Sequence, residues 1–118
     1  MVSVSRSRLA RAHGLFNVVT GLWPLVHMRS FELVLGPKAD RWLVRTVAGL
    51  TLGNGVVQNL APGSGERERQ ARLLGLTTAG TLLSVDVYYV ATGRISRMYL
   101  VDAVIEAAWL TGWAMSDR

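Results

Sequence analysis

The sequence of 118 residues has the length of one domain, and half of its residues are hydrophobic. Charged residues make up only 18%, against about 25% in an average soluble domain. The absence of cysteine excludes disulfides, a thiol nucleophile and thiolate metal sites. The formal net charge is +5, but the basic residues form short clusters beside apolar segments, as juxtamembrane charges do. We therefore expect contact with a lipid bilayer and not with nucleic acid.

Four long segments with few or no charges predict helices. They cover about residues 10–27, 42–60, 71–92 and 98–115. The first is expected to kink at Trp23-Pro24, near its far end. The stretch "HMRSFELVLGPKADRW" between the first two is too short to cross a membrane. It predicts a short interfacial helix that ends in a turn at Gly36-Pro37.

The later connections are short and polar. "APGSGERERQ" is predicted as a loop, and "GRISR" as a tight connection before the last helix. Short connections favour antiparallel neighbours, so residues 1–118 predict a single all-α domain, a four-transmembrane-helix up-down bundle. The alternative is a soluble four-helix bundle, but its helices are expected to carry outer faces rich in Lys and Glu, which this sequence lacks.

Small and uncharged polar residues recur within the predicted spans. Gly49 and Gly53 form a GxxxG pair, and Gly75 with Ala79 is a related one. Such spacing predicts close helix packing and favours a homo-oligomer. Nearby amides, such as that of Gln58, favour interhelical hydrogen bonds over a polar path.

Four ionisable residues fall inside the predicted spans at similar depths. With a rise of about 1.5 Å per residue, Arg45 lies about 5 Å inside its helix and Asp86 about 10 Å from the end of its own. Asp102 and Glu106 lie about 6 and 12 Å into the last helix. An up-down bundle brings all four toward the same side of the membrane. Because ionisable residues are costly in lipid, they are candidate functional residues.

Three more residues complete this predicted charged layer. His27 and Glu32 approach it from the end of the first helix, and Trp109 continues the face of the two carboxylates on the last helix. Trp109 is expected either to floor a pocket or to anchor the helix at the lipid interface. In one interpretation Arg45 pairs with an acid and only locks the bundle. In the other, the layer binds a ligand or ion.

The two histidines suggest two cofactor alternatives. His13 and His27 are fourteen residues apart on one helix, a separation that suits two haems only if a symmetric dimer completes the ligation. His27 with neighbouring carboxylates is the alternative, a site for a hard or borderline metal. Neither pattern is specific, so the sequence names no cofactor and no metal ligand.

The segment "GLWPLVHMRSFELVLGPKADRWLVRTVAGL" carries the pattern W-P-L-x-H, S-F-E, G-P-K and D-x-W-L-V. It resembles small four-helix integral membrane proteins of bacteria, and "YLVDAVIEAAW" resembles their last helix. The resemblance spans most of the chain. It implies the four-helix membrane fold and implies no activity.

The function we expect is binding or transport of a cation or amphipathic small molecule by the carboxylate and arginine layer. A membrane enzyme that uses acid–base chemistry on a lipid-like substrate, and an accessory protein with purely structural charges, stay open as alternatives. All but one of the thirteen basic residues are arginine, which is typical of a GC-rich bacterial genome. We expect the bacterial inner membrane, with both termini on the cytoplasmic side by a small margin of basic residues.

Overall fold

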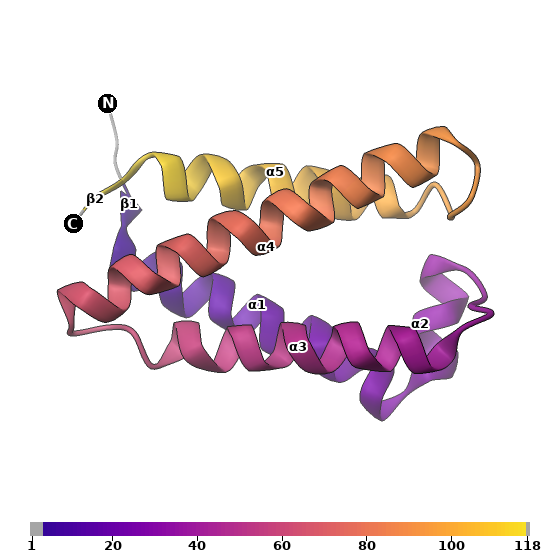
Figure 1. Cartoon of the computed structure of the whole chain (residues 1–118), viewed down its shortest axis with the longest axis horizontal. Coiled ribbons are helices and arrows are strands. Elements are labelled where there is room, and N and C mark those ends of the chain that lie inside the picture. Colours follow the sequence, from indigo (N-terminus) through magenta and orange to yellow (C-terminus); the bar gives the residue numbers. More distant parts are fainter. Residues whose placement is uncertain (1–3, 118) are drawn as a thin grey trace.

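The computed structural model describes residues 4–117 and is all-helical apart from a two-residue strand at each end. In chain order the elements are β1 (Val4–Ser5), α1 (Arg6–Val26), α2 (Met28–Leu35), α3 (Arg41–Asn59), α4 (Gly65–Ala91), α5 (Tyr99–Ala114) and β2 (Ser116–Asp117). The four long helices and the short one expected from the sequence are confirmed (Figure 1).

The junction between α1 and α2 lies beside the predicted break. Pro24 sits in the last turn of α1, and the helix ends because His27 leaves helical geometry, with φ −144° and ψ 77°. The Nδ1 atom of His27 accepts the backbone N–H of Ser30 at 3.2 Å and so caps α2. After α2 comes Gly36, whose φ of 99° favours glycine and turns the chain toward α3.

The start of α4 corrects one boundary. The charged run that was predicted as a loop forms its first turns, beginning at Gly65. The Ser64 side chain accepts the backbone N–H of Arg67 at 3.4 Å, which supplies an N-cap. Glu66 and Glu68 then stand in the first turn, where the partial positive charge of a helix N-terminus favours carboxylates.

The long helices run up and down, so that both chain ends lie at the same end of the bundle (Figure 1). There β1 and β2 pair in parallel, with Val4 opposite Ser116. Helix α1 packs most extensively against α3, and α4 against α5. The bundle is therefore two helical pairs placed side by side.

Small residues allow the close approach of α1 and α3. A Cβ on Gly55 would lie 2.6 Å from the carbonyl oxygen of Gly14, and one on Gly21 would lie equally close to the carbonyl oxygen of Ala48. The predicted pair Gly49 and Gly53 is not used in this way, since a Cβ at either residue meets nothing within 4 Å. The side of α3 that carries this pair faces away from the rest of the chain.

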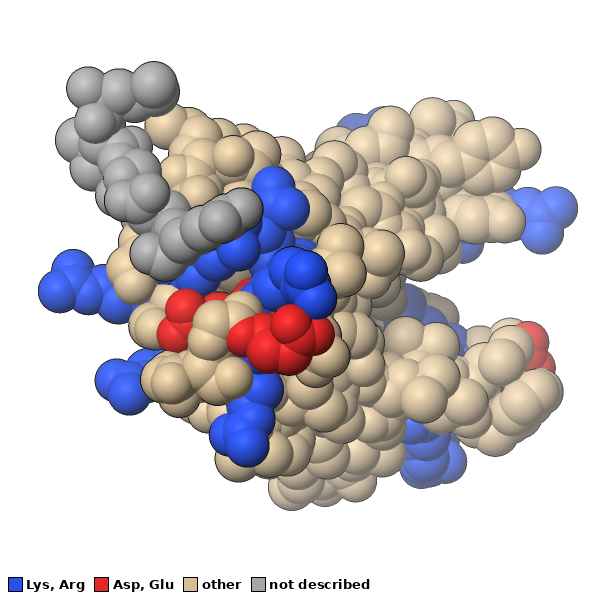
Figure 2. Space-filling model, turned by 60° about the vertical axis from the view of Figure 1, so that its left-hand side comes forward, with Lys and Arg blue, Asp and Glu red and all other residues tan. Residues whose placement is uncertain are grey.

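The distribution of polarity is inverted relative to a water-soluble bundle. Polar side chains fill much of the interior, namely those of His13, Asn17, Gln58, Asp86 and Glu106. Large apolar side chains cover the outside of α1, among them Leu15, Val19, Leu22 and Val26. Exposed leucines and valines cover the other long helices in the same way. In Figure 2 most Lys, Arg, Asp and Glu side chains gather toward the two ends, with uncharged residues between them.

Across residues 4–117, one helix, α4, is both long and apolar enough to cross a membrane by length and composition. The expectation of four such helices is thus met by only one. Helix α5 has 16 residues, slightly fewer than the roughly 17 that a span needs. Polar side chains lower the average apolar character of α1 and α3.

Candidate functional site

Three of the predicted site residues come together between α4 and α5. Asp86 on α4 and Glu106 on α5 are 2% and 1% exposed. The half-buried carboxyl group of Asp102, one turn before Glu106, lies close to both. We call Asp86, Asp102 and Glu106 the acid cluster. The expectation that the stripe of α5 carrying Asp102 and Glu106 faces inward is confirmed.

The acid cluster has no cationic partner among residues 4–117. The ion pairs in this part of the chain join Arg41 to Glu32 and Arg69 to Glu66. Among residues 4–117, one oxygen of Asp86, Oδ2, and one of Glu106, Oε1, are buried without a hydrogen-bond partner. Ionised carboxylates that lie close together in a buried site repel one another, and burial adds to the cost of their charge. Protons or a bound cation relieve this repulsion.

Arg45 is not the counter-ion that the sequence led us to expect. Its side chain is exposed and makes no ion pair within the described residues. The buried face of α3 runs through Ala48, Gly55 and Gln58, and Arg45 lies outside it near the start of the helix. A long arginine at a helix end reaches a polar surface readily, so it need not turn inward.

His27 and Glu32 also stand apart from the acid cluster. His27 is exposed and serves as the cap of α2. Glu32 accepts the backbone N–H of Lys38 at 2.8 Å and pairs with Arg41 at 2.7 Å. The Lys38 N–H makes the largest contribution to lowering the pKa of Glu32; burial opposes it, and the Arg41 guanidinium lowers the pKa further. Glu32 thus fixes the loop between α2 and α3.

Lys38 and Tyr99 connect that loop to the acid cluster. The Nζ atom of Lys38 lies 4.5 Å from the centre of the Tyr99 ring and 6.0 Å from that of Phe31. It also donates a hydrogen bond to the carbonyl oxygen of Leu35 at 3.1 Å. Tyr99 is the first residue of α5, and its phenol lies near Asp86 and Asp102. Its ring thus neighbours both the lysine and two of the acids.

A second polar group, centred on His13, was not recognised from the sequence. The indole N–H of Trp113 donates to His13 Nδ1 at 2.9 Å. Since an indole nitrogen only donates, Nδ1 must carry no proton, and His13 is the neutral tautomer with its proton on Nε2. Gln58 lies 3.3 Å from the same Nδ1 atom and accepts the Asn17 side-chain N–H at 2.8 Å. This network joins α1, α3 and α5, as the predicted role of the amides in interhelical hydrogen bonding requires.

Trp109 belongs to the His13 network and extends the stripe of the acid cluster. Its ring stacks on His13, with centroids 4.5 Å apart and planes 14° apart, and tilts against Phe16 at 5.6 Å. The Trp109 indole N–H is buried without a partner. Trp109 therefore packs inside the bundle and does not anchor it at the lipid interface.

Among residues 4–117, the structure does not bring together a set of ligands for either cofactor alternative, the two haems or the metal at His27. His13 and His27 lie in different environments, one buried and one exposed. In the part of the chain that the structure describes, no three His, Asp or Glu side chains are grouped so as to hold a metal ion.

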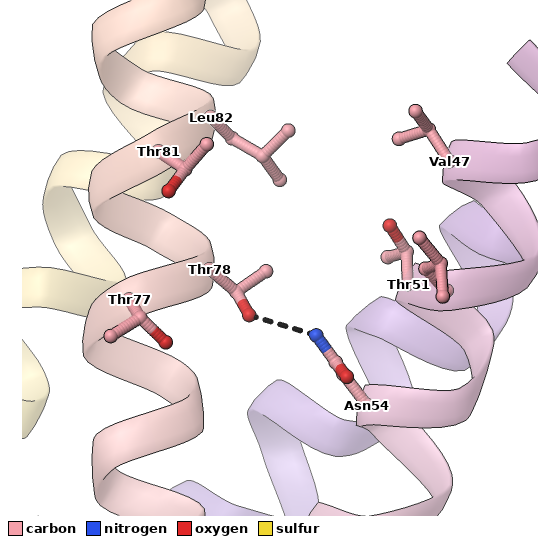
Figure 3. A pocket seen from close by; sticks show the side chains of 8 residues that line it. Val47, Thr51, Asn54, Thr77, Thr78, Thr81 and Leu82 are labelled. Atoms are coloured by element: carbon pink, nitrogen blue, oxygen red, sulfur yellow. Dashed lines mark hydrogen bonds between the residues drawn. The ribbon is translucent and has the colours of Figure 1, made fainter. Parts of the chain in front are cut away.

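A shallow groove of about 260 Å³ lies between α3 and α4. No ionisable side chain lines it, and the Asn54 amide crosses it to donate to the Thr78 hydroxyl at 3.1 Å (Figure 3). The other lining side chains are Val47, Leu50, Thr51, Thr77, Thr81 and Leu82. The groove is thus uncharged, unlike the acid cluster.

Comparison with protein-family models, with curated proteins and with solved structures finds no match to this chain. The resemblance noted from the sequence pattern therefore stays a prediction, and any functional proposal depends on the geometry of the chain itself.

Proposed function

We propose that the protein is a small helical membrane protein in which the acid cluster binds a cation in exchange for protons. The observation that carries the proposal is a group of three neighbouring carboxyls, two of them fully buried, with no cationic partner in residues 4–117. A proton on one of two neighbouring carboxyl groups relieves the repulsion between their charges. A cation that enters can replace that proton and leave the charge unchanged.

The inverted polarity of the bundle supports the membrane part of the proposal. The interior holds polar side chains, and the outer surface of every long helix carries exposed leucine or valine. In water such a surface is unfavourable by about 25 cal/mol for each Å² of apolar area. In lipid the same surface is in its preferred environment, and the polar side chains are kept inside the bundle, away from lipid.

The dimensions support four crossings. Helices α1, α3 and α4 have 21, 19 and 27 residues, hence about 28 to 40 Å at 1.5 Å per residue. A bilayer core is about 30 Å thick. Helix α5 is about 24 Å long, a mismatch that local thinning of the bilayer accommodates. Helix α2 then lies at the interface, and a bacterial inner membrane with both termini on the cytoplasmic side is the arrangement we propose.

The other two functions suggested by the sequence have less support. The enzymatic alternative used one carboxylate as acid or base with His27 assisting, but His27 is exposed and caps α2, apart from the acid cluster. The structural alternative relied on pairing with Arg45, which does not occur within the described residues.

Membrane insertion is tested by fractionation. We expect the protein in the membrane pellet after an alkaline carbonate wash and in solution only after detergent is added. Recovery of a folded, detergent-free protein from the soluble fraction would contradict the proposal.

Exchange is tested by proton release. Weakly buffered protein in detergent micelles is titrated with salts of alkali metals and of alkylammonium ions while a pH-indicator dye reports released protons. We expect release by the wild type with at least one of these cations, and much less release by Glu106→Gln and Asp86→Asn. The control is Asp40→Asn, an exposed carboxylate at the start of α3 without a side-chain capping bond. Equal release by wild type and Glu106→Gln would overturn the proposal.

A further inference from the structure

We propose that the cation taken up by the acid cluster is an organic ammonium ion, admitted between the rings of Phe31 and Tyr99, where Lys38 now places its own ammonium group. This inference depends on the proposed function, because it names the class of cation that the same site binds. It adds two residues on α2 and α5 to the route and makes Lys38 an internal competitor.

The two rings form a receptor for an ammonium group. The Lys38 Nζ atom lies 4.5 Å from the centroid of Tyr99 and 6.0 Å from that of Phe31. A cation within about 6 Å of an aromatic face is attracted by the ring quadrupole. The side chain of lysine is an alkylammonium ion tethered to the backbone. Its position thus identifies the kind of group that this pair of rings accommodates.

The same ring leads to the acids. Tyr99, Asp102 and Glu106 follow one face of α5 at spacings of three and four residues, so the cluster begins about 4.5 Å further along the helix. Both Asp86 and Asp102 interact electrostatically with the Tyr99 phenol. An ammonium ion that leaves the ring face therefore meets the unpartnered oxygens of buried acids, Asp86 Oδ2 and Glu106 Oε1.

The chemistry of the route favours an organic ammonium over a metal ion. Aromatic faces attract weakly hydrated organic cations, as in the recognition of choline and methyl-lysine. Small metal ions require several oxygen ligands in fixed positions. Within residues 4–117 no group of His, Asp and Glu has such an arrangement. The exchange balances: one carboxylic O–H ionises, its proton leaves to water, and the ammonium ion pairs with the carboxylate that forms.

The Lys38 ammonium group is suited to move away from the two rings when another cation binds there. Lys38 stands on the loop after Gly36 and Pro37, and its ammonium donates a hydrogen bond to the carbonyl oxygen of Leu35 at 3.1 Å. Burial lowers the pKa of the Lys38 ammonium, and Glu32 opposes the shift. The group is thus partly removed from water and lacks a direct ion pair within the described residues. Moving it to solvent restores its hydration.

The experiment uses n-butylammonium chloride, the free analogue of the lysine side chain, and sodium chloride as the comparison. Half-maximal proton release is measured for the full chain in detergent micelles. We expect butylammonium to act at a lower concentration than sodium on the wild type. Lys38→Met should lower the butylammonium concentration about two- to fivefold, the value that corresponds to a cation–π contact of about 0.5 to 1 kcal/mol. Tyr99→Leu should raise it by a similar factor, and Tyr99→Phe should keep the wild-type value.

The outcomes separate the two proposals. If Glu106→Gln abolishes release but Lys38→Met and Tyr99→Leu leave the ratio of butylammonium to sodium at its wild-type value, the inference is wrong and the exchange site stands. A preference of the wild type for sodium also overturns the inference. If Glu106→Gln changes nothing, the exchange proposal itself fails. Lys38→Met lies in a loop, so it provides the decisive comparison even if Tyr99→Leu folds poorly.

Discussion

Replacing Gly75 with alanine tests whether the contact between α4 and the Trp113 indole holds the bundle together. A Cβ at this position would lie 2.7 Å from Cε2 and 2.9 Å from Cδ1 of Trp113, and closer still to Nε1. An ordinary contact begins at 3.4 Å. The indole therefore has to retreat by roughly 1 Å, because the backbone of α4 cannot move without disturbing its other contacts.

The movement of the Trp113 indole lowers the free energy of unfolding by an amount that follows from its contacts. Overpacking of this kind destabilises by about 1–3 kcal/mol. The indole N–H also withdraws from His13 Nδ1, now 2.9 Å away, which costs about 1 kcal/mol. Alanine offsets about 0.5 to 1 kcal/mol, because it restricts the unfolded chain more than glycine does. We expect a net loss of about 1–3 kcal/mol in the free energy of unfolding.

The assay is SDS-induced unfolding in mixed micelles, followed by circular dichroism. The matched control is Gly80→Ala on the same helix, where a Cβ meets nothing within 4 Å. That variant should be unchanged or more stable by up to about 1 kcal/mol. In a Trp113→Ala background the penalty of Gly75→Ala should vanish, because the two changes share one contact. Equal stability of the Gly75 and Gly80 variants, or an undiminished penalty without Trp113, would refute the reasoning.

Three further predictions use the same unfolding assay or hydrogen exchange. Arg45→Leu should change the stability by less than about 0.5 kcal/mol, since the side chain is exposed and unpaired within residues 4–117; a loss above about 3 kcal/mol would restore it as a buried counter-ion. Asn17→Leu should cost about 0.6 to 1.7 kcal/mol by removing the donor to Gln58, and no loss would show that the amide pair is dispensable. The hydrogen bond from the Ser7 hydroxyl makes the largest contribution to lowering the pKa of Glu68. The ionised Glu68 therefore contributes its full stabilisation above pH 4.5, its ordinary pKa, and this stabilisation is lost as the pH falls through the lowered pKa. Amide exchange near Ser7 should accelerate there, and in Glu68→Gln it should be fast already at pH 7 (a pH-independent rate would exclude this anchor).

The sequence was sufficient to predict the inward face of α5. The spacings of four and three residues place three side chains on one face of the helix, those of Asp102, Glu106 and Trp109. This placement does not depend on which helices pack beside α5. Helix lengths were equally predictable from uncharged segments. The exceptions were the starts of α1 and α4. Helix α1 begins at Arg6, before the expected residue 10. At α4, Ser64 provides a cap, and the two glutamates that follow are favoured at the helix N-terminus.

The partners of the acids were not predictable in the same way. A rise per residue gives the depth of Arg45 and Asp86 along their helices. It does not give the side of the helix on which a residue lies, nor which helices pack together. The chain pairs α1 with α3 and α4 with α5. Asp86 thus finds its partner on the following helix, while Arg45 on α3 points elsewhere.

The His13 network was missed because His13 was considered only together with His27. A better signal was available four residues further along α1. His13 and Asn17 are one turn apart in an uncharged segment, and Gln58 is a third such polar side chain on α3. Each needs a partner in a helical interior. Because no charged residue is near these three side chains in the sequence, hydrogen bonds among themselves are the best way to pair their polar atoms.

The same polar side chains explain why mean hydropathy identifies only α4 as a span. An average along a helix counts inward and outward residues alike, whereas lipid contacts only the outward ones. On α1 the inward residues include His13 and Asn17, while the exposed Leu15 and Val19 are apolar. Internal hydrogen bonds pair one side-chain nitrogen of each of these two polar residues, whatever surrounds the bundle. For a chain this small, in which four helices share one polar interior, the apolar character of the outer face is therefore the better criterion of membrane insertion. The outer faces of α1 and α4 both carry exposed leucine and valine side chains, which supports the membrane location that we propose for both helices.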